Sequence, residues 1–365
     1  MANRVSKRAV IVGPNRPIEI WERPIPPPQP GGVVLRVQMG GVCGTDVHLW
    51  RGEVPMPGPF VLGHEGIGVI EELGQGVTTD YAGVPVGVGD RVYWIPSRPC
   101  HRCYYCTVVK DFSLCENRNL FRDANEPPSA TYCEYAWLPA GMTFYRIPDD
   151  TPPEAVIAFG CAMPTMLQGM ERLGGIALNQ TVVVQGCGPV GLAATLLARL
   201  SGARQIIVIG APERRLAMAH RLGATTTVNL ETMNTEEERD QHVRDLTAGR
   251  GAEVVIEAAG VVAAFAEGLK LVAKGGRYLI VGLWSAPGVV PVEPRYLNNN
   301  NLRIIGTALA QPQHIYGAIQ VARAHHREFP LAEAVTHRFL LAESQKALET
   351  VARLETIKAV ITPLQ

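Results

Sequence analysis

The chain has 365 residues, a length that predicts two or three domains at about 150 residues each. Its 34 lysines and arginines balance its 34 aspartates and glutamates, which argues against a protein that grips nucleic acid or an anionic membrane through bulk charge. With 47% hydrophobic and 19% charged residues, the chain is also too apolar to be intrinsically disordered.

The sequence shows no targeting segment and no membrane span. Residues 1–9 are polar and lack the apolar core of a secretory signal. The longest apolar stretch, 181–200, is interrupted by Gln185, Pro189 and Arg199, and it is more typical of a strand, a turn and a helix. We therefore expect a soluble, cytoplasmic protein with no membrane partner.

Residues 1–160 are predicted to form a compact β-rich domain. Valine, glycine and proline are frequent in this region. Short alternating runs such as Val33–Val37 and Ile67–Glu71 are separated by closely spaced turn residues, which is the pattern of half-buried strands.

Two segments of this region concentrate side chains that bind metals. The segment 41–48 contains Cys43, and the segment 63–77 contains His64. With Cys161 as a third ligand, two sulfurs and one imidazole nitrogen would bind zinc and leave its fourth position open for a substrate. For each residue alone, a buried cysteine or a core histidine is the simpler interpretation. Their combination with the features described below favours a zinc site.

A second group of four cysteines lies at Cys100, Cys103, Cys106 and Cys115, with the spacing C-x2-C-x2-C-x8-C. This spacing lets four thiolates converge on one tetrahedral ion with no open position, so the site would be structural and not catalytic. Four unrelated buried thiols and an iron–sulfur cluster are alternatives. A nucleic-acid-binding zinc ribbon is another, because basic and aromatic residues are interleaved here, although the neutral charge of the chain counts against it. These residues are Arg98, His101, Arg102, Tyr104, Tyr105 and Lys110.

From 161 to 307, short apolar runs alternate with helix-length amphipathic segments such as Val190–Leu200 and Arg214–Leu222. This rhythm predicts an α/β domain with a doubly wound parallel sheet and helices on both faces. The predicted strands are Thr181–Gln185, Gln205–Ile209, Thr225–Asn229, Glu253–Glu257 and Arg277–Val281. The tail, 308–365, combines a helix at Ser344–Leu354 with a strand at Ile357–Ile361.

The first of these strands ends in a glycine-rich loop with the pattern G-x-G-x-x-G, formed by Gly186, Gly188 and Gly191. Such glycines allow a tight turn, close approach of the backbone to a pyrophosphate and tight helix–strand packing, and the helix N-terminus then faces the phosphate charge. A turn without a ligand is the alternative. Its position between a strand and a helix favours dinucleotide binding.

The string Gly63-His64-Glu65-x2-Gly68-x5-Gly74-x2-Val77 is the zinc signature of a known family, and the four-cysteine segment and the glycine-rich loop follow in that family's order. The chain resembles a zinc-dependent medium-chain alcohol dehydrogenase from end to end. The resemblance implies a GroES-like catalytic domain at 1–160 and 308–365 and a Rossmann domain at 161–307. It also implies a homodimer or homotetramer that acts on a small-molecule alcohol or ketone and binds no nucleic acid.

The same resemblance implies roles for the metal-binding residues. Cys43, His64 and Cys161 match the ligands of a catalytic zinc, and the four clustered cysteines match those of a structural zinc, so two zinc ions are expected per chain. Asp46 matches the carboxylate that orients the zinc-bound histidine. Glu65 matches a carboxylate that lies behind the metal.

Thr45 and His48 match a proton relay of this family. In the implied mechanism zinc lowers the pKa of the alcohol, Thr45 accepts the proton, His48 passes it on, and a hydride goes to the nicotinamide. Polyol and threonine dehydrogenases often have glutamate where this chain has Cys161, which favours the alcohol branch and leaves a polyol dehydrogenase as the alternative. A zinc-free enoyl or quinone reductase of the superfamily is a further alternative that the three zinc ligands count against.

The cofactor preference is less clearly encoded. Gly210 stands where an acidic residue usually binds the adenosine ribose, and Arg214 follows it, which favours tolerance of NADP. Glu213 is placed to supply the missing carboxylate, so we expect a slight preference for NAD. Thr165 and Lys358 match positions near the nicotinamide and the pyrophosphate. The expected cofactor-binding residues are Gly186, Gly188, Pro189, Val190, Gly191, Gly210, Glu213, Arg215, Thr165, Val281 and Lys358.

Three tryptophans, Trp50, Trp94 and Trp284, are candidate walls of the substrate pocket, with ordinary core packing as the alternative. If they line the pocket, they indicate a bulky or cyclic secondary alcohol. One departure from the family has no functional account in the sequence: the segment 129–132 before Cys133 reads Ser-Ala-Thr-Tyr and lacks the expected pair of glycines.

Overall fold

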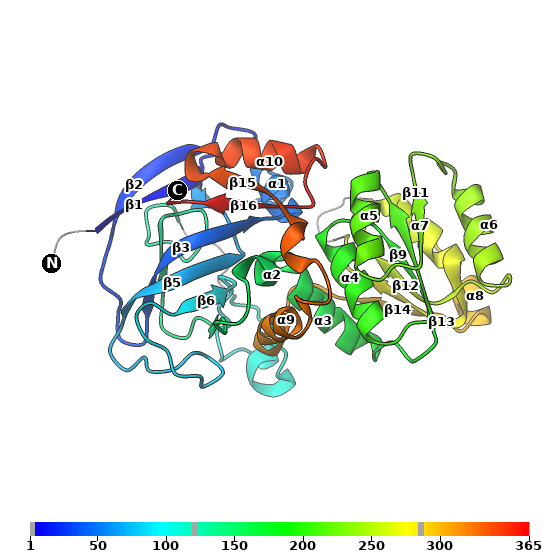
Figure 1. Cartoon of the computed structure of the whole chain (residues 1–365), viewed down its shortest axis with the longest axis horizontal. Helices are drawn as coiled ribbons and strands as arrows, with labels where there is room; N and C mark the ends of the chain where they lie inside the picture. The colour runs from blue at the N-terminus through cyan, green and yellow to red at the C-terminus, as the bar shows by residue number, and fades with distance from the viewer. Residues whose placement is uncertain (1–3, 119–122, 284–287, 365) are drawn as a thin grey trace. The chain divides into compact units, whose positions relative to one another are not determined.

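The computed structural model describes residues 4–118, 123–283 and 288–364, which form two compact units (Figure 1). The first unit comprises Met1–Cys161 and Gln311–Gln365, and the second comprises Ala162–Ala310. Both divisions lie slightly later in the chain than the expected boundaries at 160/161 and 307/308. Cys161 therefore belongs to the unit that also contains Cys43 and His64.

The first unit is built around a seven-stranded sheet with the order β15-β16-β3-β5-β6-β8, in which β7 also pairs with β3. The pair β15–β16 is parallel, and the other pairs in this sheet are antiparallel. A three-stranded antiparallel sheet has the order β2-β1-β4. The strands are β1 (Arg4–Ile11), β2 (Glu19–Ile25), β3 (Val33–Val42), β4 (Phe60–Val61), β5 (Gly66–Leu73), β6 (Arg91–Trp94), β7 (Tyr135–Leu138), β8 (Phe144–Arg146), β15 (Val335–Leu340) and β16 (Lys358–Thr362).

Two apolar layers stabilise this unit, because burying apolar surface is the main favourable term in folding. One contains Val33, Leu35 and Val37 from alternate positions of β3. The other joins α1 to α10 through residues such as Val47 and Leu348. The helices of the unit are α1 (Gly44–Arg51), α2 (Pro153–Ile157), α9 (Pro312–His325) and α10 (Ser344–Ala352), with short helices η1 (Tyr105–Val109), η2 (Phe112–Leu114), η3 (Leu331–Ala334) and η4 (Leu341–Glu343).

The second unit contains a six-stranded parallel sheet with the order β11-β10-β9-β12-β13-β14. Helices α4 and α5 cover one face of this sheet, and α6, α7 and α8 cover the other (Figure 1). This is the doubly wound order that binds dinucleotides, so the predicted fold class is confirmed. The elements are α3 (Ala162–Leu173), β9 (Thr181–Gln185), α4 (Pro189–Leu200), β10 (Gln205–Gly210), α5 (Glu213–Arg221), β11 (Thr226–Asn229), α6 (Glu236–Leu246), β12 (Ala252–Glu257), α7 (Val262–Leu271), β13 (Val272–Ile280), α8 (Pro294–Asn299) and β14 (Arg303–Gly306).

Four of the predicted parallel strands are confirmed to within one residue at each end, the fifth, β13, begins five residues earlier than predicted, and the sixth, β14, was not predicted. β14 is a short edge strand, and its residues Arg303 and Ile304 are exposed. The strands β9, β10 and β12 are buried along most of their length and read as apolar runs, whereas an exposed edge strand does not. Because β14 is not buried, its sequence lacks the apolar run from which the other strands were predicted, and the prediction missed it.

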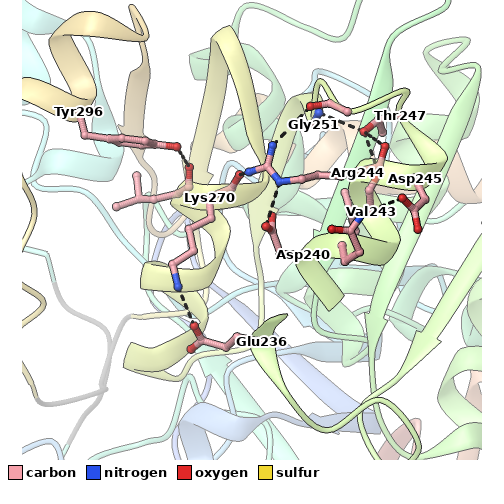
Figure 2. Close-up of polar contacts among 12 residues, drawn as sticks. Glu236, Asp240, Val243, Arg244, Asp245, Thr247, Gly251, Lys270 and Tyr296 are labelled. Atoms are coloured by element: carbon pink, nitrogen blue, oxygen red, sulfur yellow. Dashed lines mark hydrogen bonds and ion pairs between the residues drawn. The ribbon is translucent and has the colours of Figure 1, made fainter. Parts of the chain in front are cut away.

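Polar contacts join α6 to α7 on the outer side of this unit (Figure 2). Lys270 Nζ lies 3.1 Å from Glu236 Oε2, and Arg244 Nε lies 2.9 Å from Asp240 Oδ2. Arg244 Nη2 also donates to the carbonyl oxygen of Lys270 at 3.0 Å. Exposed pairs of this kind contribute about 0–1 kcal/mol each, so they add little to the stability of the fold.

None of the helices in the described ranges is long and apolar enough to cross a membrane.

Candidate active site and metal centres

Three segments of the first unit bring Cys43, His64 and Cys161 together. Cys43 directly follows β3 and is the N-cap residue of α1; His64 lies between β4 and β5, and Cys161 follows α2. One potential ligand atom from each of these residues, and one from Glu65, all lie within 4.8 Å of one another. The structure therefore assembles the predicted ligand set from positions up to 118 residues apart.

The spacing of these atoms fits zinc. The two sulfurs, Cys43 Sγ and Cys161 Sγ, are 3.7 Å apart. Two thiolates bound tetrahedrally at about 2.3 Å from zinc would be about 3.8 Å apart. A hydrogen bond from Cys161 holds the pKa of Cys43 well below that of a free thiol.

The carboxylate of Asp46 connects two of the ligands. Its Oδ1 lies 3.1 Å from His64 Nδ1, and its Oδ2 accepts a hydrogen bond from the backbone N–H of Cys43 at 2.9 Å. Asp46 is fully buried. Burial disfavours the charged imidazole, but the charge of Asp46 outweighs burial and raises the pKa of His64 well above its ordinary value. The hydroxyl of Tyr132 donates to the same Asp46 Oδ2 at 3.1 Å, a contact the sequence did not indicate.

Glu65 and Lys358 form a buried ion pair behind the three ligands. Lys358 Nζ contacts Glu65 Oε2 and donates to the carbonyl oxygen of Val42 at 3.2 Å, and both side chains are 1% exposed. The backbone N–H of Cys161 donates to Glu65 Oε1 at 2.8 Å. Burial alone would raise the pKa of Glu65, but the charges of Lys358 and His64 outweigh it and hold the pKa below its ordinary value.

The predicted contact of Lys358 with the pyrophosphate stays a prediction. In the structure its side chain is 1% exposed and paired with Glu65. The sequence could not reveal the pairing, because the two residues are 293 positions apart and meet only when β16 pairs with β3.

Thr45 and His48 both lie on α1, next to the metal-binding segment. Thr45 is half-buried, and the side chain of His48 is 37% exposed. His48 Nδ1 contacts Glu53 Oε2, a partner that the sequence analysis did not identify. Within the described part of the chain, no hydrogen bond joins Thr45 to His48.

The four remaining candidate ligands, Cys100, Cys103, Cys106 and Cys115, also place their sulfurs within 4.8 Å of one another. The backbone N–H of Cys100 donates to Cys115 Sγ at 3.3 Å. The pKa of Cys100 is lowered to about 6, mainly because the backbone N–H of Arg102 donates a hydrogen bond to its sulfur. Burial raises the pKa of Cys106 to about 12. Four converging sulfurs are the donor set of a closed zinc site.

The glycine-rich loop of the second unit has the form expected for phosphate binding. Gly186 has a φ of +105°, and a side chain at Gly191 would overlap the carbonyl oxygen of Gly186. Gly188 is the N-cap residue of α4, with Pro189 and Val190 in the first turn. A helix N-terminus beside such a loop provides N–H groups and a partial positive charge for an anion.

Gly210, at the end of β10, is closely packed against Cys187. A Cβ atom at this position would lie 2.5 Å from Cys187 Sγ, which occupies the space beside it. Burial raises the pKa of Cys187 to about 11, so this residue is a neutral thiol. An acidic residue at this point would therefore require the side chain of Cys187 to move.

The carboxylate of Glu213 is fixed at the start of α5. Asn229 Nδ2, at the end of the neighbouring strand β11, donates to Glu213 Oε2 at 2.9 Å. Arg215 is buried, with 7% of the residue exposed, and burial lowers its pKa. Thr165 is half-buried on α3, and Val281 is buried directly after β13.

The predicted tryptophan wall receives little support. Trp94 is fully buried in the core of the first unit, with its indole N–H donating to the carbonyl oxygen of Ser129 at 2.9 Å, so assigning it to the pocket wall was wrong. Trp50 is half-buried and donates to the carbonyl oxygen of Arg16 at 2.9 Å. Trp284 lies outside the described residues.

Comparisons with known proteins cover almost the whole chain. Residues 29–149 match the family model described as alcohol dehydrogenase GroES-like domain, and residues 189–324 match the one described as zinc-binding dehydrogenase. The chain is 51% identical over 357 residues to the 5-exo-hydroxycamphor dehydrogenase of Pseudomonas putida, covering 98% of each chain. It is 30% identical over 356 residues to the sorbitol dehydrogenase of Halalkalibacterium halodurans, covering 94% of this chain and 95% of that one.

Solved structures agree with these matches. An alcohol dehydrogenase from Thermotoga maritima superposes with a TM-score of 0.91 at 29% identity, covering 99% of this chain and 100% of that one. A zinc-binding dehydrogenase from Sinorhizobium meliloti, bound to NADP, has a TM-score of 0.85 at 26% identity, with the same coverage of both chains.

Proposed function

The chain belongs to the zinc-dependent medium-chain alcohol dehydrogenases, and from that premise we propose that it interconverts a bulky cyclic secondary alcohol and its ketone with NAD. The observation that carries the substrate class is the 51% identity to a hydroxycamphor dehydrogenase across 98% of both chains. Hydroxycamphor is itself a cyclic secondary alcohol. Cys161 supports the same class, because polyol relatives often have glutamate at this position.

Two zinc ions are proposed for each chain. Cys43, His64 and Cys161 would hold the catalytic ion, whose role is to polarise the alcohol oxygen and lower its pKa. The sulfur spacing of 3.7 Å and the buried carboxylate on His64 support this assignment. The four-cysteine cluster would hold the second ion, which has no open position and therefore no catalytic role.

The proton path is proposed to run through α1. Thr45 would accept the proton of the alcohol, and His48 would pass it to solvent. The exposure of His48 supports the final step, because a group that releases protons to water must reach the surface. Glu53, in contact with His48 Nδ1, fixes the ring and stabilises the positive charge that it carries during transfer.

NAD is proposed as the preferred cofactor. A carboxylate near the end of β10 binds the ribose hydroxyls of NAD and repels the 2′-phosphate of NADP. Gly210 cannot supply it, but Glu213 stands three positions later with its carboxylate held by Asn229. A Glu213→Ala variant is expected to lose efficiency with NAD and to shift towards NADP. A parent enzyme that prefers NADP a hundredfold, about 2.7 kcal/mol, would exclude this assignment.

The substrate class is tested with a panel of cyclic secondary alcohols, linear secondary alcohols, primary alcohols and polyols. Each is assayed with NAD and with NADP by following nicotinamide absorbance, and metal content is measured on the same preparation. The highest kcat/KM is expected for a rigid cyclic secondary alcohol with NAD. A preference for sorbitol-like polyols would instead support the alternative branch. A homodimer or homotetramer, and a cytoplasmic location, remain predictions that light scattering and cell fractionation can check.

A further inference from the structure

The segment 129–132 departs from the family pattern, and the structure shows where its last residue lies. The backbone N–H groups of Thr131 and Tyr132 donate to the carbonyl oxygens of Gly63 and Leu62, at 3.1 and 3.0 Å. The carbonyl oxygen of Tyr132 accepts from the N–H of Ala9 at 2.9 Å. The segment is thus paired on both sides, and it lies directly against the residues that precede His64.

The Tyr132 side chain is held as firmly as its backbone. The residue is fully buried, and its ring packs so closely on Gly63 that a side chain at that glycine would overlap it. Gly63 also has a φ of +91°, a conformation that favours glycine. The position of the Tyr132 hydroxyl is therefore fixed relative to the turn that presents His64.

That hydroxyl completes the hydrogen bonds of Asp46. The carboxylate is fully buried and needs donors on both oxygens, because an unpaired buried charge is costly. Cys43 N–H and Tyr132 O–H both donate to Oδ2, at 2.9 and 3.1 Å, which leaves Oδ1 directed at His64 Nδ1. The tyrosine thereby prevents the carboxylate from rotating away from the histidine.

We propose that Tyr132 is a positioning residue of the catalytic metal site, acting on His64 through Asp46. The inference rests on the proposed function, in which Cys43, His64 and Cys161 hold zinc. Groups that orient a metal-binding histidine change metal affinity by about 10–100-fold when they are removed. Because Tyr132 is one hydrogen bond further from His64 than Asp46 is, we expect its removal to reduce zinc affinity by the lower end of this range, about 10-fold.

The test compares Tyr132→Phe with Tyr145→Phe. Both variants delete the hydroxyl of a fully or nearly fully buried tyrosine in the first unit, and the Tyr145 hydroxyl donates to the carbonyl oxygen of Pro312 at 2.8 Å, a contact that involves no residue of the open site. Zinc loss to a chelator is measured for each, together with the absorption of cobalt introduced at the open site. The four-cysteine cluster serves as an internal control within the same chain.

Tyr132→Phe is expected to lose zinc from the open site about 10-fold more readily than the parent, with a changed cobalt spectrum. The cluster should keep its zinc, and Tyr145→Phe should behave like the parent in both measurements. In an Asp46→Asn background, Tyr132→Phe should have no additional effect, since the two residues act in series.

Equal zinc retention in Tyr132→Phe and Tyr145→Phe would overturn the inference while leaving the proposed function intact. An undiminished effect of Tyr132→Phe in the Asp46→Asn background would also overturn it, because the tyrosine would then act by another route. A parent protein that binds no metal at Cys43, His64 and Cys161 would overturn the proposed function and this inference together.

Discussion

The two clusters of candidate metal ligands in this chain differ in how they are built. The four cysteines lie within one segment, 100–115, and their sulfurs are supported by backbone N–H groups. The open site draws Cys43, His64 and Cys161 from three separate segments and is backed by the charged groups Asp46, Glu65 and Lys358. A closed cluster forms from local chain geometry, whereas the open site requires the whole first unit to be folded.

This difference predicts opposite responses to mutation. At a closed site the metal adds directly to folding free energy, because it holds a local loop together. At the open site the surrounding hydrogen bonds and ion pairs hold the ligands, so the ion contributes chemistry more than stability.

The largest effect is expected for Cys103→Ala in the closed cluster. Structural zinc contributes about 10–16 kcal/mol in zinc-finger peptides, so losing one ligand should lower the free energy of unfolding by about 5 kcal/mol. Cys133→Ala is the matched control, because Cys133 is fully buried but lies outside both clusters. Denaturant unfolding measures both variants. Equal losses in the two would mean that the cluster holds no structural metal.

Cys43→Ala in the open site is expected to remain folded but to lose one zinc and nearly all activity. The loss should reach about 4 kcal/mol of transition-state stabilisation, or roughly 1,000-fold in kcat/KM. Its Tm should stay close to that of the parent, which separates it from Cys103→Ala. Full turnover in Cys43→Ala would show that the catalytic metal is bound elsewhere.

Lys358→Met tests whether charge holds the open site in place. Removing one member of a buried pair leaves Glu65 uncompensated, and a loss of about 3 kcal/mol in unfolding free energy is expected. The double variant with Glu65→Gln should recover most of this loss, because it leaves no unpaired charge. If the single variant were as stable as the parent, the pair could not be the support inferred here.

A smaller effect is expected for His48→Gln at the exposed end of the proton path. Alcohol oxidation should slow by about 10-fold, mostly at low pH, where losing a proton acceptor is most harmful. Glu53→Gln, which keeps a hydrogen-bonding group beside the ring, should have a weaker effect. The pH–rate profiles of the three enzymes provide the measurement, and an unchanged profile for His48→Gln would remove it from the path.

The smallest effect is expected for Arg323→Ala, which removes the exposed ion pair between Arg323 and Asp150. Its loss of stability is the reference against which the loss in Lys358→Met is compared. A hydrogen bond from Arg323 lowers the pKa of Asp150 below its ordinary value of 3.8. A carboxylate whose pKa is lower in the folded than in the unfolded protein stabilises the fold at pH values above its unfolded pKa. This stabilisation is lost as the pH falls through its folded pKa. The Tm difference from the parent should therefore be small at neutral pH and vanish once the pH falls below the folded pKa of Asp150. A difference that persists there would have another cause.

The sequence was sufficient wherever the signal is local. The strand Thr181–Gln185, the glycine-rich loop after it and the four-cysteine spacing all lie in short segments, and each of them is present in the structure as predicted. The separate segments of Cys43, His64 and Cys161 became a single site only through the family resemblance. Nothing in their spacing of up to 118 residues shows that their side chains meet.

By itself, the sequence determined the α/β class, five of the parallel strands and the local spacing of the four clustered cysteines, because these depend on periodicity and on short motifs. Only the tertiary structure decided that Lys358 neutralises Glu65, that Trp94 is a core residue and that Tyr132 reaches Asp46. These are contacts between residues far apart in the chain. They exist because strands such as β16 and β3 pair in one register, and that register is set by packing of the whole unit.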